Sequence, residues 1–98
     1  MYNYNEKKLI EKVKNREMLT ETEVKILVQE FGYDEEIEDI GARWVLGART
    51  IIEIEDGFYS LHWYCGKTEY QENEYSAQIA VPVERRKVII ERDEWVEI

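Results

Sequence analysis

The stretch that decides the fold is residues 49–65, RTIIEIEDGFYSLHWYC. Two runs in which apolar and polar residues alternate flank Asp56-Gly57, a pattern typical of a β-hairpin with a two-residue turn. With Asp56 and Gly57 as the turn, Ile54 is expected opposite Tyr59. One face of this hairpin is expected to pack on the core: Thr50, Ile52, Ile54, Tyr59, Leu61, Trp63 and Cys65. Arg49, Ile51, Glu53, Glu55, Phe58, Ser60, His62 and Tyr64 are expected to form a mixed surface on the other face.

A second hairpin is expected further along the chain, after a polar loop at residues 66–78. Apolar residues alternate along residues 79–83, which are expected to form the first strand. Residues 84–87 are expected to form the turn, and residues 88–90 are expected to form the second strand. Because Pro82 has no N–H to donate, its strand is predicted to lie at a sheet edge or to be bulged.

The residues before the first hairpin predict helices. The first helix is expected at about residues 5–17, with Asn5 as its N-cap. The second begins at a capping box formed by Thr20 and Glu23, and Gly32 is expected to end it. Their core-facing stripes are Leu9, Ile10 and Val13, then Val24, Leu27, Val28 and Phe31.

The segment YDEEIEDIG, residues 33–41, has five carboxylates in six positions. It predicts a short third helix capped by Asp34, with Ile37 and Ile40 facing inward. A calcium loop is excluded, because such a loop needs glycine at its sixth position and Glu at its twelfth. Counted from Asp34, those positions hold Asp39 and Val45.

The predicted fold class is therefore α+β, in one domain spanning residues 1–98. A helical part, residues 1–41, contributes two N-terminal helices and a short acidic helix. These pack on one face of an antiparallel sheet of about four strands, formed as two hairpins by residues 42–98.

The charge of the chain is negative and uneven. The net charge is −9. Residues 1–17 carry five basic and three acidic residues, a net +2, so the rest of the chain carries −11. Such a field repels nucleic acid and anionic membranes, and it attracts basic protein surfaces. Solubility is the alternative role for this charge, and composition alone favours it.

Catalysis is not predicted, and neither a metal nor a cofactor is expected. His62 and Cys65 have the spacing H-x-x-C, but residues three apart on a strand point to opposite faces. The glycines do not form a phosphate-binding motif. With one cysteine, no apolar run of membrane-spanning length and no signal peptide, a cytoplasmic protein is expected.

The acidic residues and exposed tyrosines are predicted to form a partner-binding surface. Glu53 and Glu55 on one strand would stand about 6.6–6.8 Å apart, a spacing similar to that of successive phosphates. Tyrosine is a frequent anchor of protein interfaces. The predicted surface, a mimic of a nucleic-acid backbone, comprises Asp34, Glu35, Glu36, Glu38, Asp39, Glu53, Glu55, Tyr64, Glu69, Tyr70, Glu72, Glu74 and Tyr75.

Residues 49–75 resemble a pattern found in small phage and prophage proteins of Gram-positive bacteria. In size and acidity the chain is also similar to anti-CRISPR proteins, and the lysine-rich first helix departs from a uniformly acidic mimic. The matching residues are Ile52, Glu53, Asp56, Gly57, Phe58, Tyr59, Trp63, Gly66, Thr68, Glu69, Gln71, Glu72 and Asn73.

This resemblance implies a phage-encoded inhibitor that occupies a basic nucleic-acid-docking surface on a bacterial defence nuclease, such as an RNA-guided nuclease. The expected form is a monomer or weak homodimer that contacts neither nucleic acid nor membrane. Two alternatives stay open. One is a non-catalytic phage accessory protein that self-assembles, through a strand edge near Pro82, or tethers a host protein. The other is a small metal-dependent enzyme.

Overall fold

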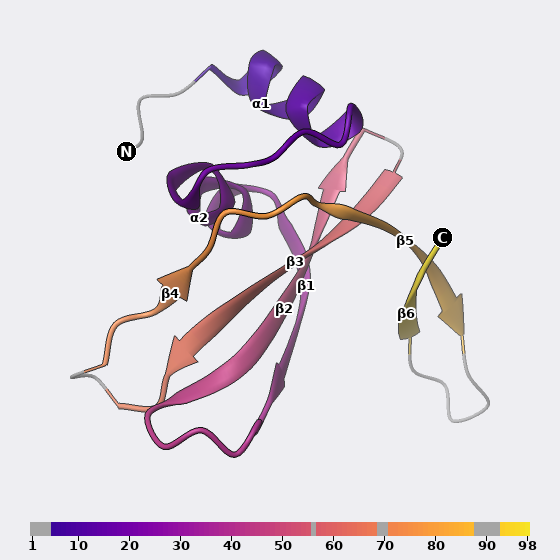
Figure 1. Ribbon diagram of the computed structural model, residues 1–98. Coiled ribbons are helices and arrows are strands. Elements are labelled where there is room, and N and C mark those ends of the chain that lie inside the picture. The colour runs from indigo at the N-terminus through magenta and orange to yellow at the C-terminus, as the bar shows by residue number, and fades with distance from the viewer. Residues whose placement is uncertain (1–4, 56, 69–70, 88–92) are drawn as a thin grey trace.

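The computed structural model describes residues 5–55, 57–68, 71–87 and 93–98. Two short helices at the N-terminal end are followed by strands that form one curled antiparallel sheet (Figure 1). The order of the strands is β1-β2-β3-β5-β6, and the short strand β4 pairs with β3 beyond the end of β5. The prediction of three helices on a small sheet is therefore wrong, because strands dominate the described structure.

The two helices form where their capping residues predict. Helix α1 (Glu6–Lys14) has Asn5 as its N-cap, and the Asn5 side chain accepts a hydrogen bond from the backbone N–H of Lys8. Helix α2 (Glu21–Glu30) begins at the capping box of Thr20 and Glu23, as predicted. It ends at Glu30 with Phe31 as C-cap, so Gly32 is not a left-handed helix terminator but the first residue of a strand.

The acidic segment predicted as a third helix is instead strand β1 (Gly32–Glu38). It pairs with β2 from Gly32 opposite Ile52 to Glu38 opposite Gly47. Helix propensity is a weak preference, and the ladder with β2 gives this backbone its hydrogen bonds instead. Ile37 and Ile40, which were predicted to face inward, are each about half exposed.

The first hairpin is present as strands β2 (Val45–Ile54) and β3 (Gly57–Gly66). Its register differs from the prediction by two residues, because Ile54 pairs with Gly57 and Ile52 pairs with Tyr59. The turn therefore comes earlier, and Glu55 adopts a left-handed conformation with φ of 54°. Because side chains alternate with a period of two, this shift leaves every residue on its predicted face.

The rest of the sheet is formed by β4 (Glu74–Tyr75), β5 (Val81–Lys87) and β6 (Asp93–Glu97). The turn predicted at residues 84–87 is part of β5, and the return predicted at residues 88–90 lies outside the described residues. Pro82 does not lie at an edge, because β5 pairs with both β3 and β6. The Pro82 carbonyl accepts a hydrogen bond from the backbone N–H of Ile98, so the backbone nitrogen of Pro82, which has no hydrogen to donate, also faces β6. The β5–β6 pairing ends at this point, with Val83 opposite Glu97, so the missing donor interrupts no further pair.

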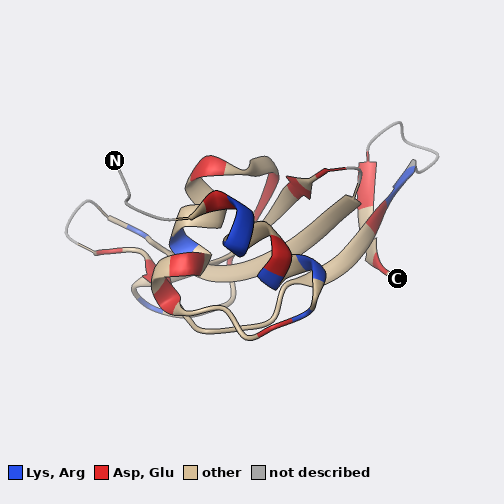
Figure 2. Ribbon diagram, turned by 90° about the horizontal axis from the view of Figure 1, so that it is seen from above, with Lys and Arg blue, Asp and Glu red and all other residues tan. Residues whose placement is uncertain are grey.

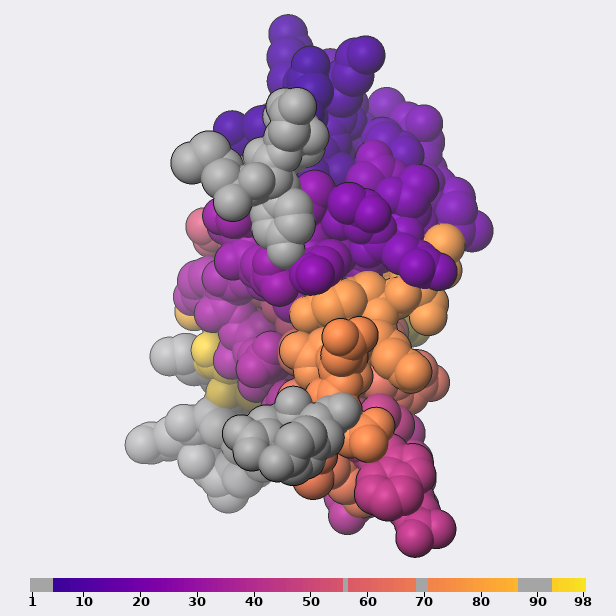
Figure 3. Space-filling view, turned by 90° about the vertical axis from the view of Figure 1, so that its left-hand side faces the viewer, coloured from indigo at the N-terminus to yellow at the C-terminus, as the bar shows by residue number. Residues whose placement is uncertain are grey.

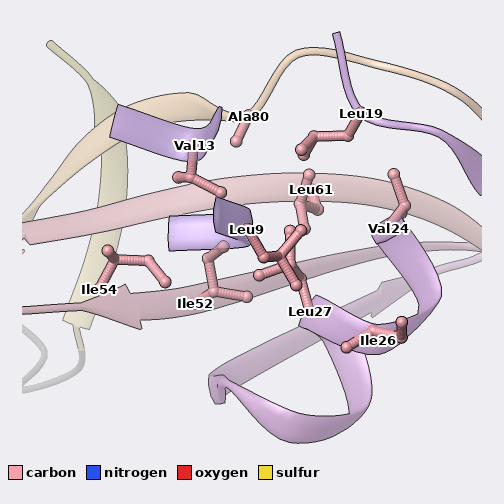
Figure 4. Close-up of a cluster of buried hydrophobic side chains, with 10 residues drawn as sticks. All are labelled: Leu9, Val13, Leu19, Val24, Ile26, Leu27, Ile52, Ile54, Leu61 and Ala80. Atoms are coloured by element: carbon pink, nitrogen blue, oxygen red, sulfur yellow. The ribbon is translucent and has the colours of Figure 1, made fainter. Parts of the chain in front are cut away.

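The helices cover one face of the sheet, here called the first face, which carries Thr50, Ile52 and Leu61. The residues predicted for the core lie there, and Trp63 donates a hydrogen bond of 2.8 Å to the buried Thr50 hydroxyl. Figure 4 shows side chains from both helices pointing toward those of β2 and β3. The members of this core are Leu9, Val13, Leu19, Val24, Ile26, Leu27, Ile52, Ile54, Leu61 and Ala80.

A second, smaller core lies on the opposite face, here called the second face. Ile51, Val83 and Trp95 are buried there, with Phe58 packed against them. This face was predicted to be a mixed surface, but Ile51 is fully buried. The sheet curls until β6 reaches β1 and β2: Trp95 Nε1 donates to Asp34 Oδ2 at 2.7 Å, although β1 and β6 are at opposite ends of the strand order.

Candidate partner-binding site

Beyond the second core, the same face of the sheet is hollowed. The pairing registers align Glu38, Gly47 and Tyr64 in one row across β1, β2 and β3. The next row contains Glu36, Arg49 and His62. Paired residues project from the same face, so these two rows line one open hollow of about 580 Å³, named here the Gly47 hollow. Its other lining residues are Ile40, Ala48, Trp63, Ser76 and Gln78.

Gly47 lies in the middle of one of these rows and determines the position of one wall of the hollow. Gly47 pairs with Glu38 on one side and with Tyr64 on the other, and both neighbours project past it. Ile40, from the connection between β1 and β2, leans over this position. A Cβ atom at residue 47 would lie 2.8 Å from Ile40 Cγ2, which is closer than real Cβ contacts allow. Glycine therefore permits the close approach of Ile40 that forms one wall.

The charge of Arg49 is engaged by the protein itself. Its Nε lies 3.2 Å from Glu36 Oε2, an ion pair that lacks hydrogen-bond alignment, and its Nη2 donates to the Trp95 carbonyl at 2.9 Å. Glu38 makes no ion pair with any of the described residues. The described residues therefore give the hollow a net negative charge, which is carried by the carboxylate of Glu38.

The far wall of the hollow is held by Gln78. Its side-chain Oε1 accepts from the backbone N–H of His62 at 2.8 Å, and its Nε2 donates to the carbonyl of His62 at 2.6 Å. The imidazole of His62 has no hydrogen-bond partner among the described residues. His62 therefore has a fixed backbone and presents its ring to the hollow.

The connection between β1 and β2 lies at the end of the molecule farthest from the helices (Figures 1 and 3), and exposed apolar side chains are found at this end. The indole of Trp44 is 51% exposed, and the guanidinium of Arg43 lies 4.6 Å from its ring centroid. The ring of Tyr64 is 42% exposed. Together with Ile37 and Ile40, these residues are named here the loop end.

Sequence reasoning identified only part of this site. It selected Glu36, Glu38 and Tyr64, but it assigned no role to Trp44. The sequence did contain a signal that could have identified Trp44: it follows Arg43 in the connection between Gly41 and the start of a strand. Indole rings in such connections are frequent interface anchors.

The predicted partner-binding acids that lie on β1 project from both faces of this strand. Asp34, Glu36 and Glu38 project from the second face and Glu35 from the first. Asp34 accepts from Trp95, and Glu36 pairs with Arg49, so these two acids hold the curl of the sheet. All residues of β1 are exposed along the strand.

The other predicted acids do not join the hollow. Asp39 accepts from Gly41 N–H and lies 3.9 Å from the Lys67 ammonium. Glu55 forms an ion pair of 3.0 Å with Lys14 of α1, and Glu53 lies toward the opposite end of β2. Figure 2 shows acidic and basic residues interspersed along the ribbon.

The remaining predicted residues belong to β4 and its connection. Glu72 and Glu74 are exposed, whereas Tyr75 is half-buried with its ring stacked on Trp63 at 5.3 Å. Tyr75 is therefore a packing residue and not a free anchor. Glu69 and Tyr70 lie outside the described residues.

Comparisons with protein-family models, with curated proteins and with solved structures found no match to this chain. Among the described residues, no cluster of three or more His, Cys, Asp or Glu is arranged to hold a metal ion. None of the helices in that part of the chain has the length and apolar character needed to cross a membrane.

Proposed function

We propose that this chain is a non-catalytic inhibitor that binds a basic, nucleic-acid-docking surface of a bacterial defence nuclease in the cytoplasm, in the manner of an anti-CRISPR protein. The observation that carries the proposal is the loop end. There, the exposed ring of Tyr64 lies in the same row as Glu38, which makes no ion pair with the described residues, and the exposed ring of Trp44 lies on the connection that leads into β2.

The composition of the loop end supports a protein partner. Two exposed aromatic rings and two exposed isoleucines lie at this end of the molecule, with Ile37 on the first face and Tyr64 on the second. Tryptophan and tyrosine supply most of the binding energy in many interfaces, where surrounding contacts exclude water from them. Singly scattered apolar residues need no explanation, but a group at one end of a small protein favours an interaction surface.

The charge of the chain supports a basic partner. A net charge of −9 raises the rate of encounter with a positive surface, and like charges repel nucleic acid itself. The acids are not gathered on one face, so the proposal does not need a continuous imitation of a phosphate backbone. It needs long-range attraction, followed by docking of the loop end.

The test uses purified RNA-guided nucleases loaded with guide RNA. Their binding to target DNA is measured by mobility shift with increasing amounts of this protein, at low and high salt. We expect loss of DNA binding at low salt that weakens as salt rises. The double variant Trp44→Ala with Tyr64→Ala should inhibit at least about tenfold less well, since two anchors are removed.

The matched control is Met18→Ala, which removes an exposed apolar side chain that lies next to α2 and not at the loop end. It should inhibit like the unmodified protein. Equal inhibition by the control and by the double variant would reject the loop end as the contact. A panel in which no nuclease is inhibited or bound would reject the proposed function.

A further inference from the structure

We infer that the Gly47 hollow is a receptor for the side chain of one arginine residue of a partner protein. This inference rests on the proposed function in one respect, namely that the partner presents a basic surface. It adds the chemical group that is recognised and the residues that recognise it.

The charges of the hollow favour a cation. Glu36 and Glu38 contribute two carboxylates, and Arg49 contributes one positive charge that already faces Glu36 and the Trp95 carbonyl. Gln78 and Ser76 are neutral, and among the described residues Arg49 is the one Lys or Arg that lines the hollow. An entering guanidinium therefore meets one open carboxylate, that of Glu38, across from the ring of Tyr64.

The shape of the hollow favours arginine over lysine. Ile40 lies over Gly47, so an entering group would lie against Ile40, with Glu38 on one side and Tyr64 on the other. A planar guanidinium stacks on an aromatic face and bonds a carboxylate through two parallel N–H groups, whereas an ammonium acts as a point charge. The apolar stem of the arginine would run along Ile40, which borders the same space.

Two parts of the wall of the hollow, at Arg49 and at His62, are held before any ligand enters. The Gln78 amide holds the backbone of His62, and Arg49 is held by contacts to β1 and β6. These two parts of the wall therefore lose little conformational freedom on binding, which favours affinity for a small group.

The test uses a capped Gly-Arg-Gly peptide as the probe, titrated into the isotope-labelled full chain while backbone amide shifts are recorded. We expect saturating shifts at Gly47, His62 and Tyr64. The same peptide with citrulline in place of arginine has the same shape without the charge, and it should leave these amides unmoved.

Two variants make the result specific. Glu38→Gln should bind the arginine peptide about tenfold more weakly, because a charge-assisted pair becomes a neutral one. Glu35→Gln removes the same charge from the same strand on the opposite face, so its affinity should change less than about twofold. Equal shifts with citrulline, equal losses in both variants, or shifts confined to other residues would overturn the inference.

The peptide experiment separates the two proposals. Arginine-specific shifts at the hollow without inhibition of any nuclease would support the receptor and reject the inhibitor. Inhibition through Trp44 and Tyr64 without such shifts would reject the receptor alone.

Discussion

The side chain of Gln78 completes the backbone hydrogen bonding of His62. Along β3, β5 pairs with Phe58, Tyr59 and Ser60, and β4 pairs with Trp63 and Tyr64. Gln78 lies between these two strands, where its own backbone pairs with Leu19 instead. Its amide therefore acts as a substitute strand residue, donating to and accepting from His62.

Replacement of Gln78 by alanine should destabilise the protein by about 2–4 kcal/mol, because two backbone groups of His62 lose their partners. Urea unfolding followed by tryptophan fluorescence measures this loss. Gln71→Ala is the control, since the Gln71 side chain makes no hydrogen bond with the described residues, and it should cost less than about 0.5 kcal/mol. Similar costs for both variants would mean that water replaces the Gln78 amide.

Replacement of Gly66 by alanine should be far more costly than the same change at Gly57. A Cβ at residue 66 would lie 2.1 Å from the carbonyl oxygen of Gln71, whereas one at residue 57 meets nothing nearer than 3.7 Å. We expect a loss of about 2 kcal/mol or more at Gly66 and less than about 1 kcal/mol at Gly57. Equal midpoints of thermal unfolding would show that the 66–73 loop shifts without cost.

The ion pair between Lys12 and Glu23 should give part of the stability a dependence on pH. Partial burial raises the pKa of Glu23, but bonds from Lys12 and from Thr20 outweigh this effect, so its pKa lies below the ordinary value. A carboxyl whose pKa is lowered by folding stabilises the protein above its unfolded pKa, and this contribution is lost as pH falls through the folded pKa. Glu23→Gln should therefore be less stable than the unmodified protein at pH 7.

This difference should shrink as the pH falls below about 4.5, the ordinary pKa at which the unfolded carboxyl takes up its proton, and it is lost as the pH falls through the lower pKa of the folded state. Free energies of unfolding at pH 7, 5, 4 and 3 measure the trend for both proteins. Glu21→Gln, two residues earlier in the same first turn and without an ion pair in the described residues, is the control. A difference that stays constant across this range would assign the effect of Glu23 to the helix cap alone.

Local patterns predicted the parts of the fold that depend on neighbouring residues. The capping box at Thr20 and Glu23 marked the start of α2. Alternation in residues 49–65 assigned Ile52 and Leu61 to the helix-covered face, even though the turn began earlier than predicted. Both patterns depend only on residues that are close together in the chain, so their spacing in the sequence is enough to predict the local structure.

The parts that sequence reasoning missed depend on contacts between distant segments. The acidic segment became β1 because β2 offers it a ladder of partners, a gain that propensity does not include. Ile51 is buried because the curl of the sheet brings Trp95 across to it, and no spacing within residues 49–65 reveals that contact. The Gly47 hollow is formed by residues of β1, β2 and β3 that are brought into two rows by the pairing of these strands. It can therefore be identified only when the register of all three strands is known.

Contacts between β3 and the loop that follows it explain two residues of the phage-like pattern. Gly66 is required by the close approach of the Gln71 carbonyl, and Asn73 accepts from the backbone N–H of Gly66 at 3.0 Å. Both roles concern the path of the loop after β3. The structure therefore gives both positions a role in folding.

The bond between Trp95 and Asp34 joins residues 61 positions apart, and it has a consequence for synthesis on the ribosome. Helices α1 and α2 and strands β1 to β3 can assemble on the first face while the rest of the chain is still within the exit tunnel. Phe58 already packs on Tyr33 of β1, but Ile51 lacks its contact with Trp95 until residues 93–97 emerge. A nascent chain stalled before that point should attract chaperones through this incompletely covered apolar residue, and release of the last strand should end the attraction.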